Sequence, residues 1–326
     1  MAATNNEVWQ IGTIANVEEV ATGIKKIVIR QSSFAVAVPG THIDLMISVN
    51  GAKVRRSYSI VAQSTDLKEL TIAVFQVKDS RGGSIAMHQL QVGDSLDITQ
   101  PIQNFPLRFG AKKYVLLAGG IGVTAIIGMA NSLKTFGADY EIHYAGRNWE
   151  AMAFTTDLTA EHCERIKFYV DDQDRSLNIN NLLSQISGDT ELYMCGPIRL
   201  MDEVRRSWVN RNLDISKLRY ETFGVSGWFD PEDFIVRLPE KNAEVRVSKD
   251  QTIVEALEAA GLEVMADCRK GECGLCEGRI IKYSGKLDHR DVFYSEGQKS
   301  EGTKIACCVS RLVGDGSTAS IEVILT

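Results

Sequence analysis

The hydrophobic positions of the first hundred residues fall in short β-rich runs. These runs cover residues 10–17, 25–30, 42–49, 54–61, 70–77 and 95–99, and glycines 23, 40, 51 and 93 interrupt them. One helix is expected near residues 85–90. Many short strands at this spacing are typical of an antiparallel barrel or sandwich. We therefore predict a multidomain chain in which residues 1–108 form a β-barrel domain.

The pattern changes after Phe109, where apolar strands alternate with helical segments. Strands are predicted at residues 114–118, 140–144, 166–170, 191–195 and 218–223, with helices ending at about 136 and spanning 199–210. Alternation of this kind predicts a parallel sheet. Residues 109–226 are thus expected to form an α/β domain. Gly227, Pro231 and several acidic residues favour a linker around 224–233.

The last part of the chain, residues 233–326, is predicted to be a third domain of the α+β type. It begins with a hairpin at 234–238 and 243–247, followed by a helix that Gln251 and Thr252 cap and Gly261 ends. A loop rich in glycine and cysteine spans 267–278, and strands are predicted near 279–283, 305–309 and 321–325. At roughly 100 to 200 residues per domain, three domains fit the length of the chain.

Composition and charge exclude some classes of function. The chain has 44% hydrophobic and 24% charged residues, which is typical of a globular protein. Its net charge of −6 argues against nucleic-acid binding, which requires a basic face. The first residues do not resemble a signal peptide, and no run of about 18 apolar residues occurs. We expect a cytoplasmic protein with no membrane partner.

Five of the seven cysteines lie in the last 60 residues, and their spacing points to iron–sulfur chemistry. Four residues separate Cys268 from Cys273, and two separate Cys273 from Cys276, as in plant-type [2Fe–2S] proteins. Cys307 or Cys308 would supply the fourth thiolate. The loop glycines, which we expect to adopt positive φ and wrap the cluster closely, are Gly271, Gly274 and Gly278.

Two other metal centres are weaker interpretations of the same loop. Four cysteines also suit zinc, but zinc ribbons pair two short knuckles of similar spacing and only one is present. A Rieske centre needs two histidine ligands, and this region holds only His289. The five histidines of the chain are scattered, and we interpret them as surface or core residues.

Residues 116–124, with the sequence LLAGGIGVT, place a strand, a glycine turn and a helix start in order. Backbone amides at such a turn can bind a pyrophosphate, although a turn needed only for packing would look similar. Cys195 and Gly196 end a later parallel strand, where the glycine lets a nicotinamide approach and the thiol can lie near its reactive carbon. A buried core cysteine is the alternative.

Asp171 and Asp172 follow the strand that ends at Val170. A carboxylate at this place can accept hydrogen bonds from ribose hydroxyls and repel a 2′-phosphate, which favours NADH over NADPH. A solvated loop charge is the alternative.

Two segments of the barrel are candidates for a flavin site. In Arg56-Ser57-Tyr58-Ser59 the arginine can bind a phosphate, the tyrosine can pack on an isoalloxazine ring and the serine can bond its N5. Gly82-Gly83-Ser84 precedes the short helix and offers amides to the same phosphate. A flavin is also expected because NADH delivers two electrons together, whereas a [2Fe–2S] cluster accepts one.

Together these motifs resemble the phthalate dioxygenase reductase family, which feeds electrons to Rieske-type aromatic-ring oxygenases and related demethylases. The resemblance covers nearly the whole chain. It is carried by residues 56–59, 79–84 (DSRGGS), 119–124, 143–147 (HYAGR), 195–197 (CGP), 268–276, 288–291 (DHRD) and 308–311 (CVSR).

The resemblance implies a six-stranded flavin barrel, a five-stranded NADH domain and a C-terminal β-grasp ferredoxin domain, with FMN as the flavin. It implies Cys308 as the fourth ligand beside Cys268, Cys273 and Cys276. Phe223 would cover the flavin ring until nicotinamide displaces it. Ser59 and Cys195 would also lie beside the place where the hydride passes from nicotinamide to flavin. The cofactor-binding residues expected from motifs and resemblance are Arg56, Ser57, Tyr58, Ser59, Gly82, Gly83, Ser84, Gly119, Gly120, Gly122, Thr124, Arg147, Asp172, Cys195 and Gly196.

The expected function is electron transfer from NADH through FMN and [2Fe–2S] to a Rieske-type, phthalate-like oxygenase component, by a monomeric reductase. One alternative is a flavin reductase whose last domain is a zinc-stabilised interaction module. Another is a reductase of a different monooxygenase, such as a diiron enzyme, although in that class the ferredoxin unit usually comes first. The sequence does not identify the substrate of the partner.

Overall fold

The computed structural model describes residues 7–49, 51–77, 82–224 and 226–325. Residues 79–81 of the DSRGGS motif lie outside this part of the chain. The chain divides into two compact units, one of residues 1–196 with 208–221 and the other of residues 197–207 with 222–326. The division into domains at 108, 226 and 233 remains a prediction, and the two units are described separately.

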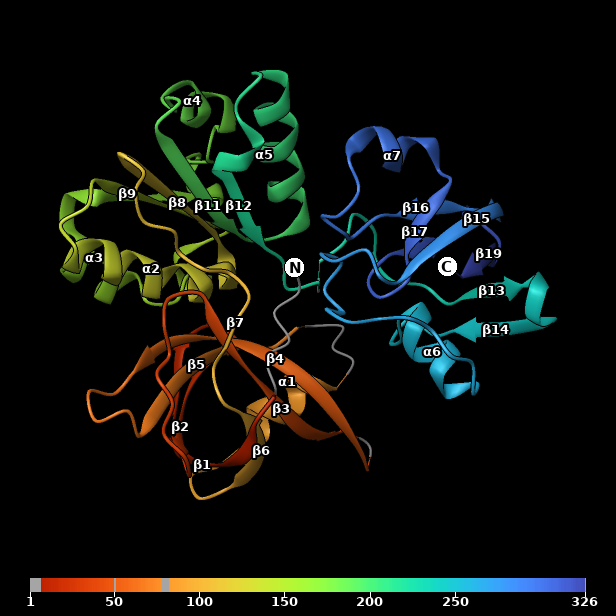
Figure 1. Cartoon of the computed structure of the whole chain (residues 1–326), viewed down its shortest axis with the longest axis horizontal. Coiled ribbons are helices and arrows are strands. Elements are labelled where there is room, and N and C mark those ends of the chain that lie inside the picture. The colour runs from red at the N-terminus through yellow and green to blue at the C-terminus, as the bar shows by residue number, and fades with distance from the viewer. Residues whose placement is uncertain (1–6, 50, 78–81, 225, 326) are drawn as a thin grey trace. The chain divides into compact units, whose positions relative to one another are not determined.

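The first sheet of unit one is a closed antiparallel barrel (Figure 1). Six strands follow the order β4-β5-β2-β1-β6-β3, and a β3–β4 pairing closes the ring. A two-residue strand, β7, is added beside β3. Buried isoleucines and leucines fill the interior, so the expected barrel is confirmed. Its elements are β1 (Trp9–Ala21), β2 (Ile24–Gln31), β3 (Thr41–Val49), β4 (Ala52–Gln63), β5 (Glu69–Phe75), α1 (Gly83–Gln89), β6 (Ser95–Thr99) and β7 (Ile102–Gln103).

The second sheet of unit one is parallel, with the order β10-β9-β8-β11-β12. The chain starts at the central strand β8, runs outward to β10 and returns to β11, so the order reverses between β8 and β11. Ligands of such sheets bind outside the carboxyl ends of the strands at this reversal. The elements are β8 (Lys113–Gly119), α2 (Val123–Thr135), β9 (Tyr140–Gly146), α3 (Thr155–His162), β10 (Ile166–Val170), α4 (Ile179–Ser184), β11 (Thr190–Cys195) and β12 (Leu218–Glu221). The helix α5 (Ile198–Asn210) follows β11, and most of it is assigned to unit two.

Unit two carries a mixed sheet with the order β14-β13-β19-β15-β17, which is the expected ferredoxin fold. The helix α6 begins at a capping box in which Thr252 and Glu255 bond each other's backbone N–H, as predicted for Thr252. The elements are β13 (Phe234–Leu238), β14 (Ala243–Val247), α6 (Ile253–Ala259), β15 (Glu277–Ser284), β16 (Lys286–Asp288), α7 (Glu296–Glu301), β17 (Lys304–Ala306), β18 (Arg311–Val313) and β19 (Ala319–Leu325).

Some elements differ from the predicted ones. The strand predicted at 305–309 ends at Ala306, because the next three residues turn. The short elements α3, α4, α7, β7, β16 and β18 were not predicted. Single helical turns occur at Gly120–Gly122, Trp149–Ala151, Cys163–Arg165, Asp171–Gln173, Ile215–Lys217 and Pro239–Lys241. Among the described residues, no helix has the length and apolar character needed to cross a bilayer.

Candidate functional site

The glycine turn after β8 lies against the carboxyl end of β11. A Cβ on Gly122 would lie 2.2 Å from the carbonyl oxygen of Cys195 and 2.8 Å from the amide nitrogen of Gly196. Only a residue without a side chain fits there. The two motifs proposed for the nucleotide are therefore brought together at the reversal point of the sheet.

The residues of this turn differ in what they offer a ligand. Gly119 ends β8, and Gly120 has φ +51°, where a Cβ would meet no atom within 4 Å, so the space in front of it is open. The hydroxyl of Thr124 donates to the carbonyl of Ile121 at 3.0 Å, and the residue is buried. Thr124 thus braces the turn. Cys195 is also buried, with 1% of its surface exposed.

The loops after β9 and β10 carry the other nucleotide candidates. The backbone N–H of Asp172 donates to the carbonyl of Arg147 at 3.1 Å, so these exposed residues lie side by side. The carboxylate of Asp171 accepts from the hydroxyl of Ser176 at 2.8 Å. Of the two aspartates, Asp172 is therefore the better placed to meet a ribose.

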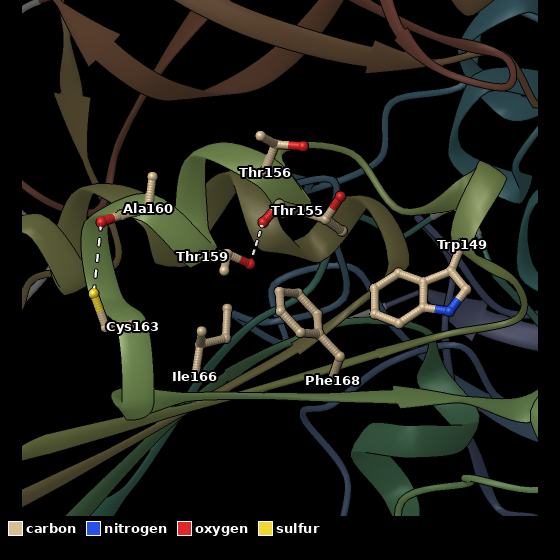
Figure 2. A pocket seen from close by; sticks show the side chains of 8 residues that line it. All are labelled: Trp149, Thr155, Thr156, Thr159, Ala160, Cys163, Ile166 and Phe168. Atoms are coloured by element: carbon tan, nitrogen blue, oxygen red, sulfur yellow. Dashed lines mark hydrogen bonds between the residues drawn. The ribbon is translucent and has the colours of Figure 1, made fainter.

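A pocket lies beside β10 (Figure 2). Trp149 and Phe168 close one end with ring centroids 5.3 Å apart. Cys163, whose thiol donates to the carbonyl of Ala160, lies at the other end. Its lining contains none of the residues that the sequence nominated; it consists of Trp149, Thr155, Thr156, Thr159, Ala160, Cys163, Ile166 and Phe168.

In the barrel, the guanidinium of Arg56 lies over the start of α1. A Cβ on Gly83 would lie 2.7 Å from Nε of Arg56. Gly82 precedes it with φ +86°, and the hydroxyl of Ser84 accepts from the N–H of Val77 at 3.2 Å. A cation and a glycine backbone thus meet at one place, which is the composition that a phosphate requires.

The side chains of β4 alternate between two faces. Tyr58 packs against the barrel core, and burial raises its pKa to about 12, so the phenol is neutral at physiological pH. The buried Ser59 lies on the opposite face, and its hydroxyl is 3.5 Å from Oε2 of Glu221 at the end of β12. The barrel and the parallel sheet therefore meet at Ser59.

Ser57 is engaged inside the protein. Its hydroxyl donates to Asp44, a buried carboxylate that Arg55 also contacts and that lies 3.7 Å from Nε2 of His42. Burial acts to raise the pKa of Asp44, but the Ser57 hydrogen bond and the charges of His42 and Arg55 hold it below its usual 3.8. The hydroxyl of Ser57 is thus bonded to a carboxylate inside the protein. This bond is not evidence for the predicted contact of Ser57 with a flavin, which stays a prediction.

In unit two, the four thiols predicted as ligands approach one another. The Cys308 thiol is within hydrogen-bonding distance of those of Cys268 and Cys276, and the Cys273 thiol is within reach of Cys268. Cys273 is the exposed member and Cys276 and Cys308 are buried. In the described residues, no group of three or more histidine, cysteine or acidic side chains is arranged to hold a metal ion. The thiols instead approach in pairs.

Backbone amides and neighbouring thiols stabilise negative charge at this site. The N–H groups of Lys270 and Glu272 point at the Cys268 sulfur, each at 3.4 Å. Hydrogen bonding from the Cys308 thiol, aided by these amides, lowers the pKa of Cys268 to about 4 in spite of burial. The same bonding raises the pKa of Cys308. Amides directed at thiolate sulfurs are a feature of iron–sulfur sites.

The neighbouring thiol of Cys307 points elsewhere. It is completely buried, a Cβ on Gly278 would lie 3.1 Å from its sulfur, and burial raises its pKa. The N–H of Cys308, in contrast, donates to the Cys276 sulfur at 3.4 Å. The structure therefore places Cys308, and not Cys307, beside Cys268 and Cys276, while the choice of Cys308 as the fourth ligand stays a prediction.

Two of the three loop glycines have the expected conformation. Gly271 has φ +77°, and a Cβ there would lie 2.9 Å from Cα of Asp291. Gly274 has φ +78°, and the ring of Phe293 occupies the space of a side chain. The prediction for Gly278 was wrong. It is paired with Ile305 and Leu325 within β15, where it makes room for Cys307 rather than turning the chain.

Phe223 lies in unit two and is half-buried. The N–H of the preceding residue, Thr222, donates to Oε1 of Glu272 in the cysteine loop at 2.8 Å. Sequence reasoning missed the carboxylates of Asp44, Glu221 and Glu272. Glu221 could have been found, because it lies at the end of a strand of the parallel sheet. Asp44 and Glu272 could not, because their roles depend on contacts with Ser57 on the neighbouring strand and with Thr222, 50 residues away.

Two protein-family models match the chain. Residues 236–313 match a 2Fe-2S iron-sulfur cluster binding domain, and residues 14–106 match an oxidoreductase FAD-binding domain. These matches agree with a cysteine-ligated cluster in unit two and a flavin site in the barrel.

Three relatives span most of the chain. The carnitine monooxygenase reductase subunit of Acinetobacter baumannii is 32% identical over 305 residues, 92% of this chain and 94% of the relative. The heme-dependent oxidative N-demethylase beta subunit of Ectopseudomonas mendocina is 35% identical over 295 residues, 88% and 92% of the two chains. The phthalate dioxygenase reductase of Burkholderia cepacia is 31% identical over 264 residues, 79% and 80%.

A solved structure has the same architecture. Phthalate dioxygenase reductase, described as a modular structure for electron transfer from pyridine nucleotides to [2Fe–2S], matches with a TM-score of 0.73 and 29% identity. The match covers 97% of this chain and 98% of that chain.

Proposed function

Because this chain belongs to the phthalate dioxygenase reductase family, we propose that it oxidises NADH and delivers electrons singly to a Rieske-type oxygenase component. The path runs from NADH to FMN in the barrel and then to a [2Fe–2S] cluster in unit two. The chain is an oxidoreductase of oxygenase systems. Our proposal goes beyond this in three respects, namely that the flavin is FMN, that the nucleotide is NADH and that the partner is a Rieske-type oxygenase component.

The observation that carries the proposal is the pairwise approach of the thiols of Cys268, Cys273, Cys276 and Cys308, with backbone amides directed at the Cys268 and Cys276 sulfurs. The donor set is all sulfur, and the plant-type spacing and the matched 2Fe-2S domain agree with it.

When bound, the flavin accepts the two electrons of a hydride and releases them one at a time, and the cluster carries one electron. The protein supplies position and electrostatics. Arg56 beside Gly83 would hold the flavin phosphate, and the neutral Tyr58 would lie against the ring system. Ser59 would direct its hydroxyl to the ring edge, with Glu221 as its partner inside the protein.

The parallel sheet would hold the nucleotide across its reversal point. The open space in front of Gly120 suits a pyrophosphate, and Gly196 suits the approach of a nicotinamide ring. Asp172 would accept from the ribose hydroxyls, and its negative charge would repel the 2′-phosphate of NADPH. This is the reason that we propose NADH as the electron donor.

The partner is proposed from relatives. Phthalate dioxygenase reductase serves, by its name, a dioxygenase, and we propose a Rieske-type component of that kind for this chain. A haem-dependent component is the second candidate, because the N-demethylase beta subunit is 35% identical over 88% of the chain. We also propose that the protein is a monomer and acts in the cytoplasm.

The test is a visible absorption and low-temperature EPR spectrum of the purified protein, before and after anaerobic addition of NADH. We expect a flavin band with cluster shoulders, which bleaches as a rhombic signal of the reduced cluster grows. Metal analysis should give two irons per chain, within experimental error. Released flavin, identified by chromatography, should be FMN.

The same samples distinguish the alternatives. If the protein contains stoichiometric zinc and flavin but no iron, it is a flavin reductase and the cluster assignment is rejected. NADPH acting as well as NADH would contradict the role of Asp172. Stopped-flow mixing of the reduced protein with a purified Rieske component, and separately with a haem component, identifies the acceptor class.

A further inference from the structure

The residues on both sides of Phe223 are attached to the cysteine loop. Thr222 is the first residue of the segment with which the chain returns to unit two. Its N–H donates to Oε1 of Glu272 at 2.8 Å, across 50 residues of sequence, and Thr222 is 3% exposed. The bond joins a buried backbone amide to a carboxylate.

Glu272 is also attached to the cluster ligands. It lies between Cys268 and Cys273 in the loop, and its own N–H points at the Cys268 sulfur at 3.4 Å. One residue therefore bonds a ligand thiol through its backbone and the Thr222 amide through its side chain. A change in either contact would be transmitted through a single residue.

Gly224 attaches the other side of Phe223. A Cβ on Gly224 would lie 3.1 Å from Val309 and 3.5 Å from Cα of Lys270, so its backbone packs against both arms of the cysteine site. Its N–H donates to Oγ1 of Thr222 at 3.2 Å. Phe223 is therefore held between two residues that are fixed to the cluster loop.

We propose that Glu272 is a positioning residue that fastens the segment 222–224 to the cluster loop, so that Phe223 and the cluster move as one body. This inference rests on the proposed function, in which the cluster accepts the electrons of the flavin one at a time. Each transfer oxidises the flavin by one electron and reduces one ferric iron of the cluster to ferrous iron. The rate of such a transfer depends on the distance and orientation of the two centres, so a loop that is no longer held in place transfers electrons more slowly.

The experiment compares Glu272→Ala with Glu272→Gln. Alanine removes the acceptor of the Thr222 amide, whereas the glutamine carbonyl can still accept from it. The first measurement is hydrogen–deuterium exchange, resolved to single residues, which does not depend on activity. We expect the Thr222 amide to exchange at least about tenfold faster in Glu272→Ala and within about threefold of wild type in Glu272→Gln.

The second measurement is stopped-flow reduction by NADH, with flavin and cluster followed at separate wavelengths. In Glu272→Ala, flavin reduction should stay within about twofold of wild type while cluster reduction slows by roughly tenfold or more. Glu272→Gln should restore most of the transfer rate. Glu301→Ala, which removes an exposed carboxylate at the end of α7, is the control and should match wild type.

Wild-type transfer in Glu272→Ala would overturn the inference, and so would equal slowing in Glu272→Gln. If the alanine variant lacks iron, Glu272→Asp replaces it, because aspartate keeps the charge but is one methylene too short to reach Thr222. Fast transfer in an iron-replete Glu272→Asp would also overturn the inference. Failure of wild type itself to reduce a cluster would instead reject the proposed function.

Discussion

The carbonyl oxygen of Cys195 would lie 2.2 Å from a methyl group placed on Gly122. We therefore expect Gly122→Ala to separate the glycine turn from β11. Overpacking of this kind costs about 1 to 3 kcal/mol, because the clash is with backbone and not with a flexible side chain. The thermal unfolding midpoint should fall and the KM for NADH should rise.

Gly120→Val is the matched change two residues earlier. Its Cβ would meet no atom within 4 Å, so the packing of the turn is preserved, although φ +51° costs about 1 to 2 kcal/mol for a residue with a side chain. The KM for NADH should rise roughly tenfold as the side chain crowds the pyrophosphate. Unchanged NADH kinetics in both variants would reject the nucleotide site.

The adjacent cysteines 307 and 308 should respond oppositely to substitution. Cys308→Ser is expected to lose the cluster, and Cys273→Ser should keep NADH-driven flavin reduction but lose onward transfer. Cys307→Ala should retain full iron and the EPR signal, with a loss of stability of about 1 to 2 kcal/mol from the small cavity. Iron analysis and EPR check all three. A Cys308→Ser protein with a native cluster spectrum would disprove this ligand set.

Asp172 should determine the choice of nucleotide. Removing its carboxylate in Asp172→Ala leaves Arg147 nearby, and we expect kcat/KM for NADPH to rise about tenfold. The control is Asp171→Ala, because Asp171 accepts from Ser176 and is expected to have little effect on selectivity. Steady-state kinetics with both nucleotides measure the ratio, and an unaltered ratio in Asp172→Ala would count against this assignment.

The barrel should lose stability in acid through Asp44. The folded-state pKa of this carboxyl is below its usual 3.8, so its charged form stabilises the fold above that value, and the contribution is lost as pH falls through the folded pKa. At neutral pH, Asp44→Asn should cost about 1 to 3 kcal/mol, since the amide meets Arg55 without a charge. The free energy of unfolding can be measured in urea, with flavin release as the signal. Below about pH 4 it should depend less on pH in Asp44→Asn than in wild type.

The fold could be predicted largely because its strands are short and its periodicity is regular. Strands 166–170, 234–238 and 243–247 agree with the structure residue for residue. The helices α3 and α4 escaped prediction because each is at most eight residues long and takes its stability from tertiary packing.

The residues of the candidate site likewise include some that could be predicted from the sequence and some that could not. Motifs with local spacing, such as the cysteine loop and the glycine turn, identified their residues in advance. The bond from Thr222 to Glu272 could not be anticipated, because 50 residues of sequence separate the two. The bond from Ser57 to Asp44 depends on the exact register of β3 against β4, which places the two residues opposite each other and which the hydrophobic pattern does not specify. Gly278 was misjudged for a related reason: a glycine needed for space looks the same in sequence as one needed for a turn.

Cys307 and Cys308 are chemically identical thiols on neighbouring residues, yet only Cys308 lies beside the thiols of Cys268 and Cys276. The turn after β17 makes this selection, because the N–H of Cys307 donates to the carbonyl of Cys276 while the N–H of Cys308 donates to the Cys276 sulfur. A displacement of the strand by one residue would exchange the two thiols. The register of β17 against β15 therefore determines which of two neighbouring thiols is offered to the cluster, so the pairing of these two strands is part of the specificity of the site.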